Sequence, residues 1–450
     1  MKINNRLHKF FWLTPLSSIS ICFFFILISA CNKKQDFSES HAKEWPVYLG
    51  DKQNSHYSRL DQINTSNIEK LKVAWEYNTG DADTLGGSQI QCNPIIVNGI
   101  LYGTSPKLKV FALEAATGRE RWLFDPSVDT DFSMNVNRGL SYWEEKDDQR
   151  ILFTAGAYLF AVDARTGLPV QSFGNFGRVS LKEKLGEWAR NLYVVSTTPG
   201  IVYGDLLIIG TRVSEGAQAA PGYIRAYNIK TGAVAWTFHT IPKPGEFGYD
   251  TWPEDAHKRI GGVNSWAGMA LDEERGIVYV PTGSAAYDFY GGNRKGTNLF
   301  ANCLLALNAS TGERIWHFQT VHHDIWDRDL PAPPNLITVT QEGKKIDAVA
   351  QITKSGFVFL FDRETGKPLF EIVERPVKKS DLEGEESWPT QPFPLRPPPF
   401  SGQSLTENNI TDISTESHNY IAGILKNVRS GEQFIPPSMQ GTLIYPGFDG

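Results

Sequence analysis

Short stretches in which apolar and polar residues alternate recur along this chain, and each of them ends in a Thr–Gly pair. The clearest copies are residues 110–118, 159–167, 224–232, 304–312 and 358–366. Alternation with a period of two predicts a β-strand with one buried face, and the Thr–Gly pair predicts a tight turn into a second strand. In four copies that second strand carries an aromatic residue four positions after the glycine: Trp122, Trp236, Trp316 and Phe370.

The spacing of these repeats predicts how they assemble. Their glycines lie 49, 65, 80 and 54 residues apart, so each repeat holds a few strands with insertions of variable length. Small sheets of this kind bury both faces when they stack radially, which predicts an all-β chain folded as a β-propeller. We expect Trp122, Trp236 and Trp316 to lie between neighbouring sheets. Residues 72–77 match the second half of a repeat, and we expect them to complete the last blade.

The repeats do not close a ring. Residues 441–446 begin another strand pattern shortly before Gly450. The sequence therefore predicts a propeller whose C-terminal blades are missing from this chain. Residues 377–402 contain six prolines and little alternation, so we expect a long surface loop there.

The N-terminus has the pattern of an export signal. Three basic residues precede an apolar run from 19 to 28, and small residues then lead to Cys31. We interpret residues 1–30 as a bacterial lipoprotein signal peptide and Cys31 as the lipid-bearing first residue of the mature chain. An ordinary signal peptide or a short membrane helix is the alternative. Residues 31–44 would then form a polar tether and 45–450 the folded domain.

Composition agrees with a β-rich globular protein. The 450 residues are 41% hydrophobic and 21% charged, and 40 glycines with 26 prolines indicate many turns. A net charge of -6 without a basic run argues against nucleic acid, whose phosphates require clustered lysine and arginine. Cys92 and Cys303 could form a disulfide, which the sequence leaves open. The chain has no Cys-x-x-Cys-His motif for haem attachment.

The densest group of titratable residues is the run 320–331, with two histidines and three aspartates. A surface loop does not need this density for solubility, so we expect a reaction centre here. His322 and His323 are adjacent and face opposite ways on an extended chain, which favours a role in positioning the loop over a shared metal. We expect Asp324 to cap or orient the same loop.

Several motifs lie in order along most of the chain: the Thr–Gly–x–x–x–Trp repeats, Asn137–Trp143, Gly261–Trp266 and His322–Asp327. They resemble the motifs of the pyrroloquinoline-quinone (PQQ) dependent dehydrogenases, and most closely the membrane-bound glucose and quinate dehydrogenase branch. The resemblance covers residues 45–450. It implies an eight-bladed propeller that oxidises an alcohol, sugar or polyol by hydride transfer to the quinone.

The resemblance also implies roles for single residues. Asp327 matches the general base for the hydroxyl proton, and Lys354, 27 residues later, matches the cation that contacts the quinone oxygens. Arg138 matches a partner of a cofactor carboxylate, and Thr197 a hydroxyl that bonds the cofactor. Trp266 matches the indole on which the planar cofactor stacks.

Each of these assignments has a structural alternative. Asp327 could belong to a loop ion pair, Lys354 could be an exposed strand end, and Arg138 could be an ordinary surface arginine. Trp266 could instead pack between sheets. Gln91 stands where relatives often have glutamate, and we include it among the cofactor-binding candidates.

A hard cation such as Ca²⁺ is also implied beside the cofactor. Glu215 matches a carboxylate ligand, and Asp327 and Asp329 offer further oxygens together with those of the quinone. Ser284 stands where the family usually has an asparagine ligand, and a hydroxyl is the poorer ligand. Glu215 could instead be a carboxylate of a surface turn.

The sequence thus predicts a periplasm-facing, lipid-anchored quinoprotein dehydrogenase with PQQ and Ca²⁺, or a similar cation, as cofactors. The expected substrate is an alcohol, sugar or polyol, and the expected electron acceptor is a membrane quinone or a soluble carrier. A non-catalytic propeller scaffold and a sugar-binding propeller are the alternatives.

Overall fold

The computed structural model describes residues 44–127 and 136–447. The predicted signal peptide, Cys31 and all but the last residue of the predicted tether lie outside these ranges. No helix within the described ranges is long and apolar enough to cross a membrane.

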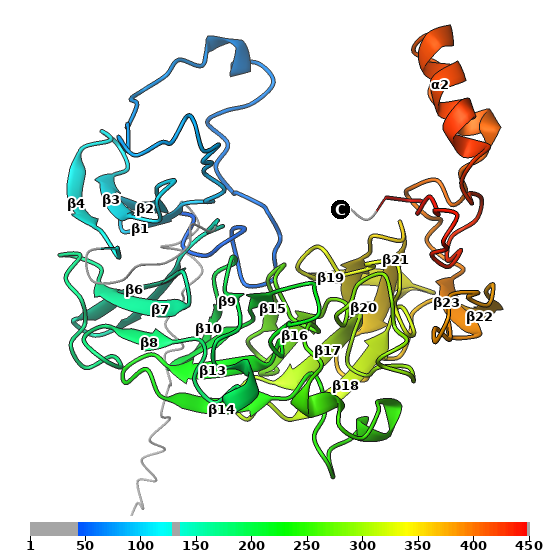
Figure 1. Cartoon of the computed structure of the whole chain (residues 1–450). Helices are drawn as coiled ribbons and strands as arrows, with labels where there is room; N and C mark the ends of the chain where they lie inside the picture. Colours follow the sequence, from blue (N-terminus) through cyan, green and yellow to red (C-terminus); the bar gives the residue numbers. More distant parts are fainter. Residues whose placement is uncertain (1–43, 128–135, 448–450) are drawn as a thin grey trace, which may run out of the picture. The chain divides into compact units, whose positions relative to one another are not determined.

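Most of the described chain forms small antiparallel sheets that follow one another in chain order (Figure 1). The first four sheets have four strands each. The first sheet contains β1 (Ile95–Val97), β2 (Ile100–Thr104), β3 (Val110–Glu114) and β4 (Glu120–Phe124), and the second contains β5 (Ser141–Glu145), β6 (Asp148–Ala155), β7 (Tyr158–Asp163) and β8 (Arg178–Ser180). The third contains β10 (Ile201–Tyr203), β11 (Leu206–Ile209), β13 (Ile224–Asn228) and β14 (Val234–Phe238), and the fourth contains β15 (Ala270–Asp272), β16 (Ile277–Pro281), β17 (Cys303–Asn308) and β18 (Arg314–Gln319). The predicted alternating runs are the third strands of these sheets, so this part of the prediction is confirmed.

A fifth sheet has three strands and contains the last predicted run. Its strands are β19 (Asn335–Gln341), β20 (Lys344–Ile352) and β21 (Val358–Asp362). Two strand pairs complete the β structure: β9 (Val194–Val195) with β12 (Arg212–Val213), and β22 (Ile372–Pro376) with β23 (Thr390–Pro394). The helices are α2 (Thr415–Leu425) and the 3₁₀ turns Ile68–Lys70, Glu187–Ala189, Tyr249–Thr251, Ala256–Lys258 and Glu407–Asn409.

The hydrophobic core lies between successive sheets. Each neighbouring pair of sheets shares one apolar cluster, whose buried members include Ile95 with Ile151, Leu159 with Leu207, Ile224 with Val278, and Tyr279 with Val349. The three sheets between the first and the fifth therefore bury both faces, as the repeat predicted. These five sheets are the ones that the described residues contain, and the number of blades in a complete ring stays a prediction.

Tryptophans join neighbouring sheets at the Thr–Gly turns. Trp236 lies against Gly312, and its Nε1 donates a hydrogen bond to the carbonyl of Ala309 at 3.1 Å. Gly312 has a φ of +75°, and a Cβ there would lie 2.5 Å from the indole, so both backbone and space require glycine. Two further pairs repeat this contact: Trp122 with Gly167 and Trp316 with Gly366. The predicted position of the three tryptophans is confirmed.

The seam between the second and third sheets lacks such a tryptophan. Its Thr–Gly turn presents the carbonyl of Ile229, which accepts a hydrogen bond from Nη1 of Arg150 at 2.8 Å. Arg150 is 5% exposed, and its guanidinium lies 5.5 Å from the ring centre of Trp143. A buried guanidinium thus replaces the indole at this seam.

Residues 72–77 form no strand within the described part of the chain. The strands of the last blade that they are expected to complete are not among the described residues, so their place in that blade stays a prediction. Trp75 nevertheless lies against Gly118 and donates to the carbonyl of Ala115 at 3.1 Å, as the other tryptophans do at their turns. No strand among the described residues pairs with its backbone, and the indole contact alone does not make a strand.

Other predicted boundaries also need correction. Residues 441–446 form only an isolated bridge between Thr442 and Arg429, not a strand. Residues 377–402 are not one loop, because β23 lies within them and pairs with β22. Pro392 and Pro394 are two positions apart on a two-stranded ribbon, where an edge strand tolerates missing N–H donors.

The Trp–Gly contact can be tested by Gly312→Ala. We expect the free energy of unfolding to fall by about 2–4 kcal/mol, because a left-handed backbone and a clash with Trp236 add together. Gly343→Ala is the matched control, since Gly343 has a φ of +78° with open space around it, and should cost about 1–2 kcal/mol. Urea unfolding of both variants measures the difference. Equal losses would contradict a role for the indole contact.

Candidate functional site

Asp327, Asp329 and Lys354 form a group in which one ammonium faces two carboxylates. Both aspartates lie between β18 and β19, and Lys354 lies in the turn between β20 and β21. Nζ of Lys354 is 3.2 Å from Oδ2 of Asp327 and 3.6 Å from Oδ2 of Asp329. The lysine side chain is only 7% exposed, so it is not an exposed strand end. The structure brings the predicted base and cation together.

Charge is unbalanced within this group. Burial raises the pKa of Asp327 to about 8, with the charge of Asp329 acting in the same direction and Lys354 against it. Burial acts to lower the pKa of Lys354, but Asp329 and Asp327 outweigh it and the net direction is upward. Two carboxylates share one ammonium, so the group can hold a proton or a further cation.

Trp266, Arg138 and Thr197 extend the group. Nε1 of Trp266 donates to Oδ2 of Asp329 at 3.0 Å. The guanidinium of Arg138 lies over the Trp266 ring, 5.5 Å from its centre, and Nη1 of Arg138 donates to Oγ1 of Thr197 at 2.8 Å. Direct contacts therefore join six predicted residues in series: Thr197, Arg138, Trp266, Asp329, Lys354 and Asp327.

Arg138 is a half-buried cation that forms no ion pair with a carboxylate of the described residues. Burial lowers its pKa, and the charge of Arg212 on β12 adds to this effect while Tyr48 opposes it. A guanidinium over an indole face suits a planar anion, because arginine binds carboxylates with its planar fork.

Asp324 holds the loop that carries the two aspartates of this group. Its carboxylate accepts hydrogen bonds from the backbone N–H of Trp326 at 2.9 Å and of Arg328 at 2.6 Å. It also accepts from Nδ2 of Asn302 at 2.9 Å and from the hydroxyl of Ser284. These bonds confirm the predicted orienting role of Asp324.

The backbone of this loop is not extended at Asp327. Asp327 has a φ of +54°, in the left-handed region, yet Asp327 and Asp329 still reach the same ammonium. Arg328 does not pair with Asp327, because its Nη1 donates to the carbonyl of Lys354 at 3.0 Å. A curved backbone thus brings both carboxylates to one ammonium.

The two histidines bind different partners. His322 contacts Oε1 of Gln319 at 2.8 Å and Oε1 of Glu374 at 3.2 Å. His323 contacts the carbonyl of Gly296 at 2.7 Å and Oε1 of Glu385 at 2.9 Å, and the side chains of this ion pair are 1% exposed. Their positioning role is therefore confirmed.

Of the remaining predicted site residues, Ser284 contacts the group of Asp327, Asp329 and Lys354, whereas Glu215 and Gln91 form no hydrogen bond or ion pair with it in the described part of the chain. The backbone N–H of Ser284 donates to Oδ1 of Asp329 at 2.6 Å, but its hydroxyl donates to Asp324 and is already engaged. Glu215 is exposed, and its charge acts on the buried Asp288. Gln91 is bonded to Gln89 at 3.1 Å, and the structure does not bring it into the series of contacts.

Sequence reasoning missed Asp288 and Arg212. Asp288 is 8% exposed, and burial raises its pKa to about 8, with the charges of Asp329, Glu215 and Asp324 in the same direction and Arg294 against them. It lies beyond β16 in a segment without strand periodicity. Arg212 is on a two-residue strand, which is too short for a pattern. Only the fold places either residue beside the group.

A hard cation suits the chemistry of this donor set, because several buried or half-buried carboxylates face few positive charges. Within residues 44–127 and 136–447, however, no three His, Cys, Asp or Glu side chains converge on a common metal position. The side chains alone therefore do not form a complete coordination shell, and a bound cation would need oxygens from another molecule.

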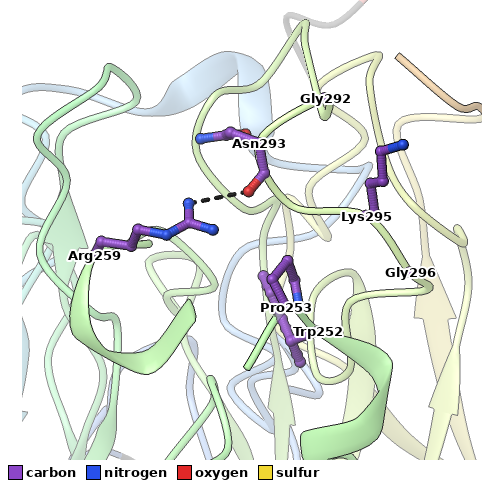
Figure 2. Close-up of a pocket in the computed structure, with 7 residues that line it drawn as sticks. All are labelled: Trp252, Pro253, Arg259, Gly292, Asn293, Lys295 and Gly296. Atoms are coloured by element: carbon purple, nitrogen blue, oxygen red, sulfur yellow. Dashed lines mark hydrogen bonds between the residues drawn. The ribbon is translucent and has the colours of Figure 1, made fainter. Parts of the chain in front are cut away.

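A pocket of about 600 Å³ opens elsewhere, between Trp252, Arg259 and the segment Gly292–Gly296 (Figure 2). Nη1 of Arg259 donates to the carbonyl of Asn293 at 3.0 Å across it. Both of its cations are already paired, Arg259 with Asp255 and Lys295 with Glu386. None of the predicted site residues lines it.

Comparison with known proteins gives one family. Residues 45–450 match the family model described as "PQQ: Glucose/ethanol/alcohol dehydrogenase, beta-propeller domain". The chain is 32% identical to the quinoprotein glucose dehydrogenase of Escherichia coli (strain K12) over 429 residues, which are 90% of this chain and 53% of that protein. It is also 32% identical to a quinate/shikimate dehydrogenase (quinone) of Acinetobacter baylyi over 432 residues, again 90% and 53%.

Solved structures agree with this family. The quinohemoprotein alcohol dehydrogenase from Comamonas testosteroni superimposes with a TM-score of 0.63 at 27% identity, covering 79% of this chain and 53% of that one. The chain spans about half the length of the curated relatives it matches. The predicted family and the β-propeller domain are confirmed.

The support of the loop by Asp324 can be tested by Asp324→Asn. We expect the free energy of unfolding to fall by about 2–4 kcal/mol, because an amide NH₂ would face N–H donors that now meet a buried carboxylate. Urea unfolding measures the loss, and the exposed Asp412→Asn serves as control. A change below about 0.5 kcal/mol, typical of surface substitutions, would contradict the role of Asp324.

Proposed function

The chain belongs to the PQQ-dependent glucose, ethanol and alcohol dehydrogenase family, and we propose that it binds PQQ at the group around Trp266 and oxidises an alcohol, sugar or polyol. The observation that carries the proposal is the continuous series of contacts from Thr197 to Asp327. It combines a flat indole, a guanidinium that forms no ion pair with a carboxylate of the described residues, and an ammonium beside a carboxylate with a raised pKa.

The residues fit this cofactor in shape and charge. The face of Trp266 suits a planar ring system, and Arg138 with its neighbour Arg212 suits carboxylates on that ring. Thr197 adds a hydroxyl at the same end. Lys354 would lie near the reacting carbonyl oxygen, because it contacts Asp329, to which the indole is hydrogen-bonded.

Asp327 is the proposed general base. When bound, PQQ supplies a quinone that accepts a hydride. A carboxylate oxygen of Asp327 would take the proton of the substrate hydroxyl, and the carbon that bears this hydroxyl would give its hydride to the quinone, so the alcohol would become a carbonyl compound. Lys354 places a positive charge where negative charge develops on the acceptor oxygen. Burial of both side chains strengthens these interactions by excluding water.

Ca²⁺ or a similar hard cation is proposed beside the cofactor. Asp327, Asp329 and Glu215 are the proposed carboxylate ligands, with the remaining oxygens supplied by PQQ. A cation here would offset the excess of negative charge around Lys354 and lower the pKa of Asp327, which favours the base form.

A membrane quinone is the proposed electron acceptor, because the relative from Acinetobacter baylyi carries quinone in its name. A soluble carrier is the alternative. Lipid attachment at Cys31 would hold the protein at a bacterial membrane, facing the periplasm. This part of the proposal depends on the residues that precede Cys31 in the sequence.

The base can be tested by Asp327→Asn in protein loaded with PQQ and Ca²⁺. We expect kcat to fall by about 10²–10⁴-fold, because the amide cannot accept the proton, while PQQ remains bound. The wild-type rate should rise with pH through the pKa of Asp327. Dye-linked assays over a panel of alcohols, sugars and polyols measure the rate, and Asp412→Asn is the control. An unchanged rate would contradict the mechanism, and absence of PQQ binding in wild type would favour a scaffold.

Cofactor and cation are expected to bind interdependently, because the described side chains do not complete a metal shell. Ca²⁺ should bind at least about 10-fold more tightly to PQQ-loaded than to unloaded protein, and PQQ affinity should rise by the same factor with Ca²⁺. Isothermal titration of Ca²⁺ with and without PQQ measures this coupling. Equal Ca²⁺ affinity in both states would show that the cation site needs no cofactor oxygens.

A further inference from the structure

Arg328 lies in the chain between Asp327 and Asp329, but its side chain forms no ion pair with either of them in the described part of the chain. The residue is 1% exposed. Its Nη1 donates to the carbonyl of Lys354 at 3.0 Å and to the carbonyl of Gly447 at 3.3 Å. The guanidinium therefore reaches from the loop between β18 and β19 to the turn between β20 and β21, which carries the proposed catalytic cation.

The main chain of Arg328 is held independently of this contact. Its N–H donates to Oδ2 of Asp324 at 2.6 Å, and its carbonyl accepts a hydrogen bond from Nδ2 of Asn302 at 2.9 Å. Asp324 is 1% exposed and Asn302 is 0% exposed, so water does not compete for these two bonds. The side chain of Arg328 thus extends from a fixed point in the loop.

The turn that carries Lys354 has little other support at this residue. Within residues 44–127 and 136–447, the bond from Arg328 is the only hydrogen bond to the main chain of Lys354. The ammonium of the same residue contacts Oδ2 of Asp327 at 3.2 Å. Two consecutive residues therefore hold Lys354 at both ends, Asp327 through its side chain and Arg328 through its carbonyl.

Stability alone does not explain a buried arginine at this position. Nε and Nη2 of Arg328 are buried and have no hydrogen-bond partner among the described residues. N–H donors removed from water without a partner cost free energy, which an apolar side chain of similar length would avoid. The buried Arg150, by contrast, uses Nε and both Nη atoms in hydrogen bonds. The bond that Arg328 does make to Lys354 therefore points to a role in the site.

We propose that Arg328 is a positioning residue for the oxidation, because it fixes the main chain of Lys354 and so determines where the ammonium lies. The inference rests on the proposed function, in which Lys354 stabilises the negative charge that develops on the acceptor oxygen. A displacement of about 1 Å in such a site can lower the rate by about 100-fold. Arg328 acts through Lys354 and is not itself a catalytic residue.

Amide hydrogen exchange of the protein without cofactor tests the contact directly. Arg328→Met keeps an unbranched side chain and removes its N–H donors. We expect the amides of residues 353–357 to exchange at least about 5-fold faster in this variant, because the turn loses its bond to the loop. Residues 320–327 should exchange as in wild type, since Asp324 still bonds the main chain of their loop.

Kinetics of protein loaded with PQQ and Ca²⁺ test the role in the reaction. We expect Arg328→Met to lower kcat per bound PQQ by about 10–100-fold and to leave KM within about threefold, because Arg328 does not contact the substrate. Arg328→Lys keeps one donor and should retain more of the rate than Arg328→Met. The matched control is Arg259→Met, which removes another guanidinium that donates to a backbone carbonyl and should keep the wild-type rate.

A double-mutant cycle shows whether Arg328 acts through Lys354. In the Lys354→Met background, Arg328→Met should lower kcat by less than about twofold, because the group that it positions is gone. An equal loss in the presence and absence of Lys354 would overturn the inference. If Lys354→Met is too slow to measure, faster exchange confined to residues 353–357 supports the inference, and faster exchange throughout 320–331 overturns it.

The proposed function and this inference fail in different ways. A wild type that shows no PQQ-dependent oxidation would overturn the proposed function, and the inference with it. An active wild type together with an Arg328→Met variant of the same kcat would overturn the inference alone. Unchanged amide exchange at residues 353–357 in that variant would do the same.

Discussion

The contact between an indole and the glycine of the next sheet is the interaction on which the rest of the structure depends. Each small sheet exposes two apolar faces that it can cover only with its neighbours, so the spacing between sheets must be fixed. The tryptophan does this by filling the space that a missing Cβ leaves and by bonding a backbone carbonyl of the facing turn. Where the tryptophan is absent, Arg150 bonds the equivalent carbonyl. The loops that carry the site begin and end on sheets held in this way.

At the candidate site, which these sheets position, carboxylates outnumber the positive charges near them. Asp327 and Asp329 face one ammonium, and the charge of Asp329 acts on the buried Asp288. Carboxylates this close repel one another, so other bonds must hold the backbone of the loop that carries them. The carboxylate of Asp324 holds it from one side, and the buried pair of His323 and Glu385 holds it from the other. Hydrogen bonds to the loop thus stabilise a backbone whose functional side chains repel one another.

The sequence predicted what depends on local pattern. Alternation and Thr–Gly pairs located the third strand of each sheet, and the family resemblance pointed to Asp327 and Lys354, which are in contact. It could not locate Asp288, because nothing in residues 284–288 distinguishes a buried carboxylate from an exposed one. It also treated prolines as a loop signal in 377–402, although a two-stranded ribbon accommodates them. Resemblance placed Ser284 among the ligands, but only the hydrogen bonds of the fold show that its hydroxyl is engaged.

The series of contacts from Thr197 to Asp327 also determines when this protein can acquire a cofactor. Its members come from loops between sheets and, for Lys354, from a turn within the fifth sheet, and Arg138 and Lys354 are 216 residues apart in the chain. No single sheet contains enough of the series to bind a planar anion. A chain without its fifth sheet also lacks Lys354, so it cannot complete the series. The proposed cofactor would therefore find its complete site only once the fifth sheet has docked, and a chain folded only in part would lack the redox centre.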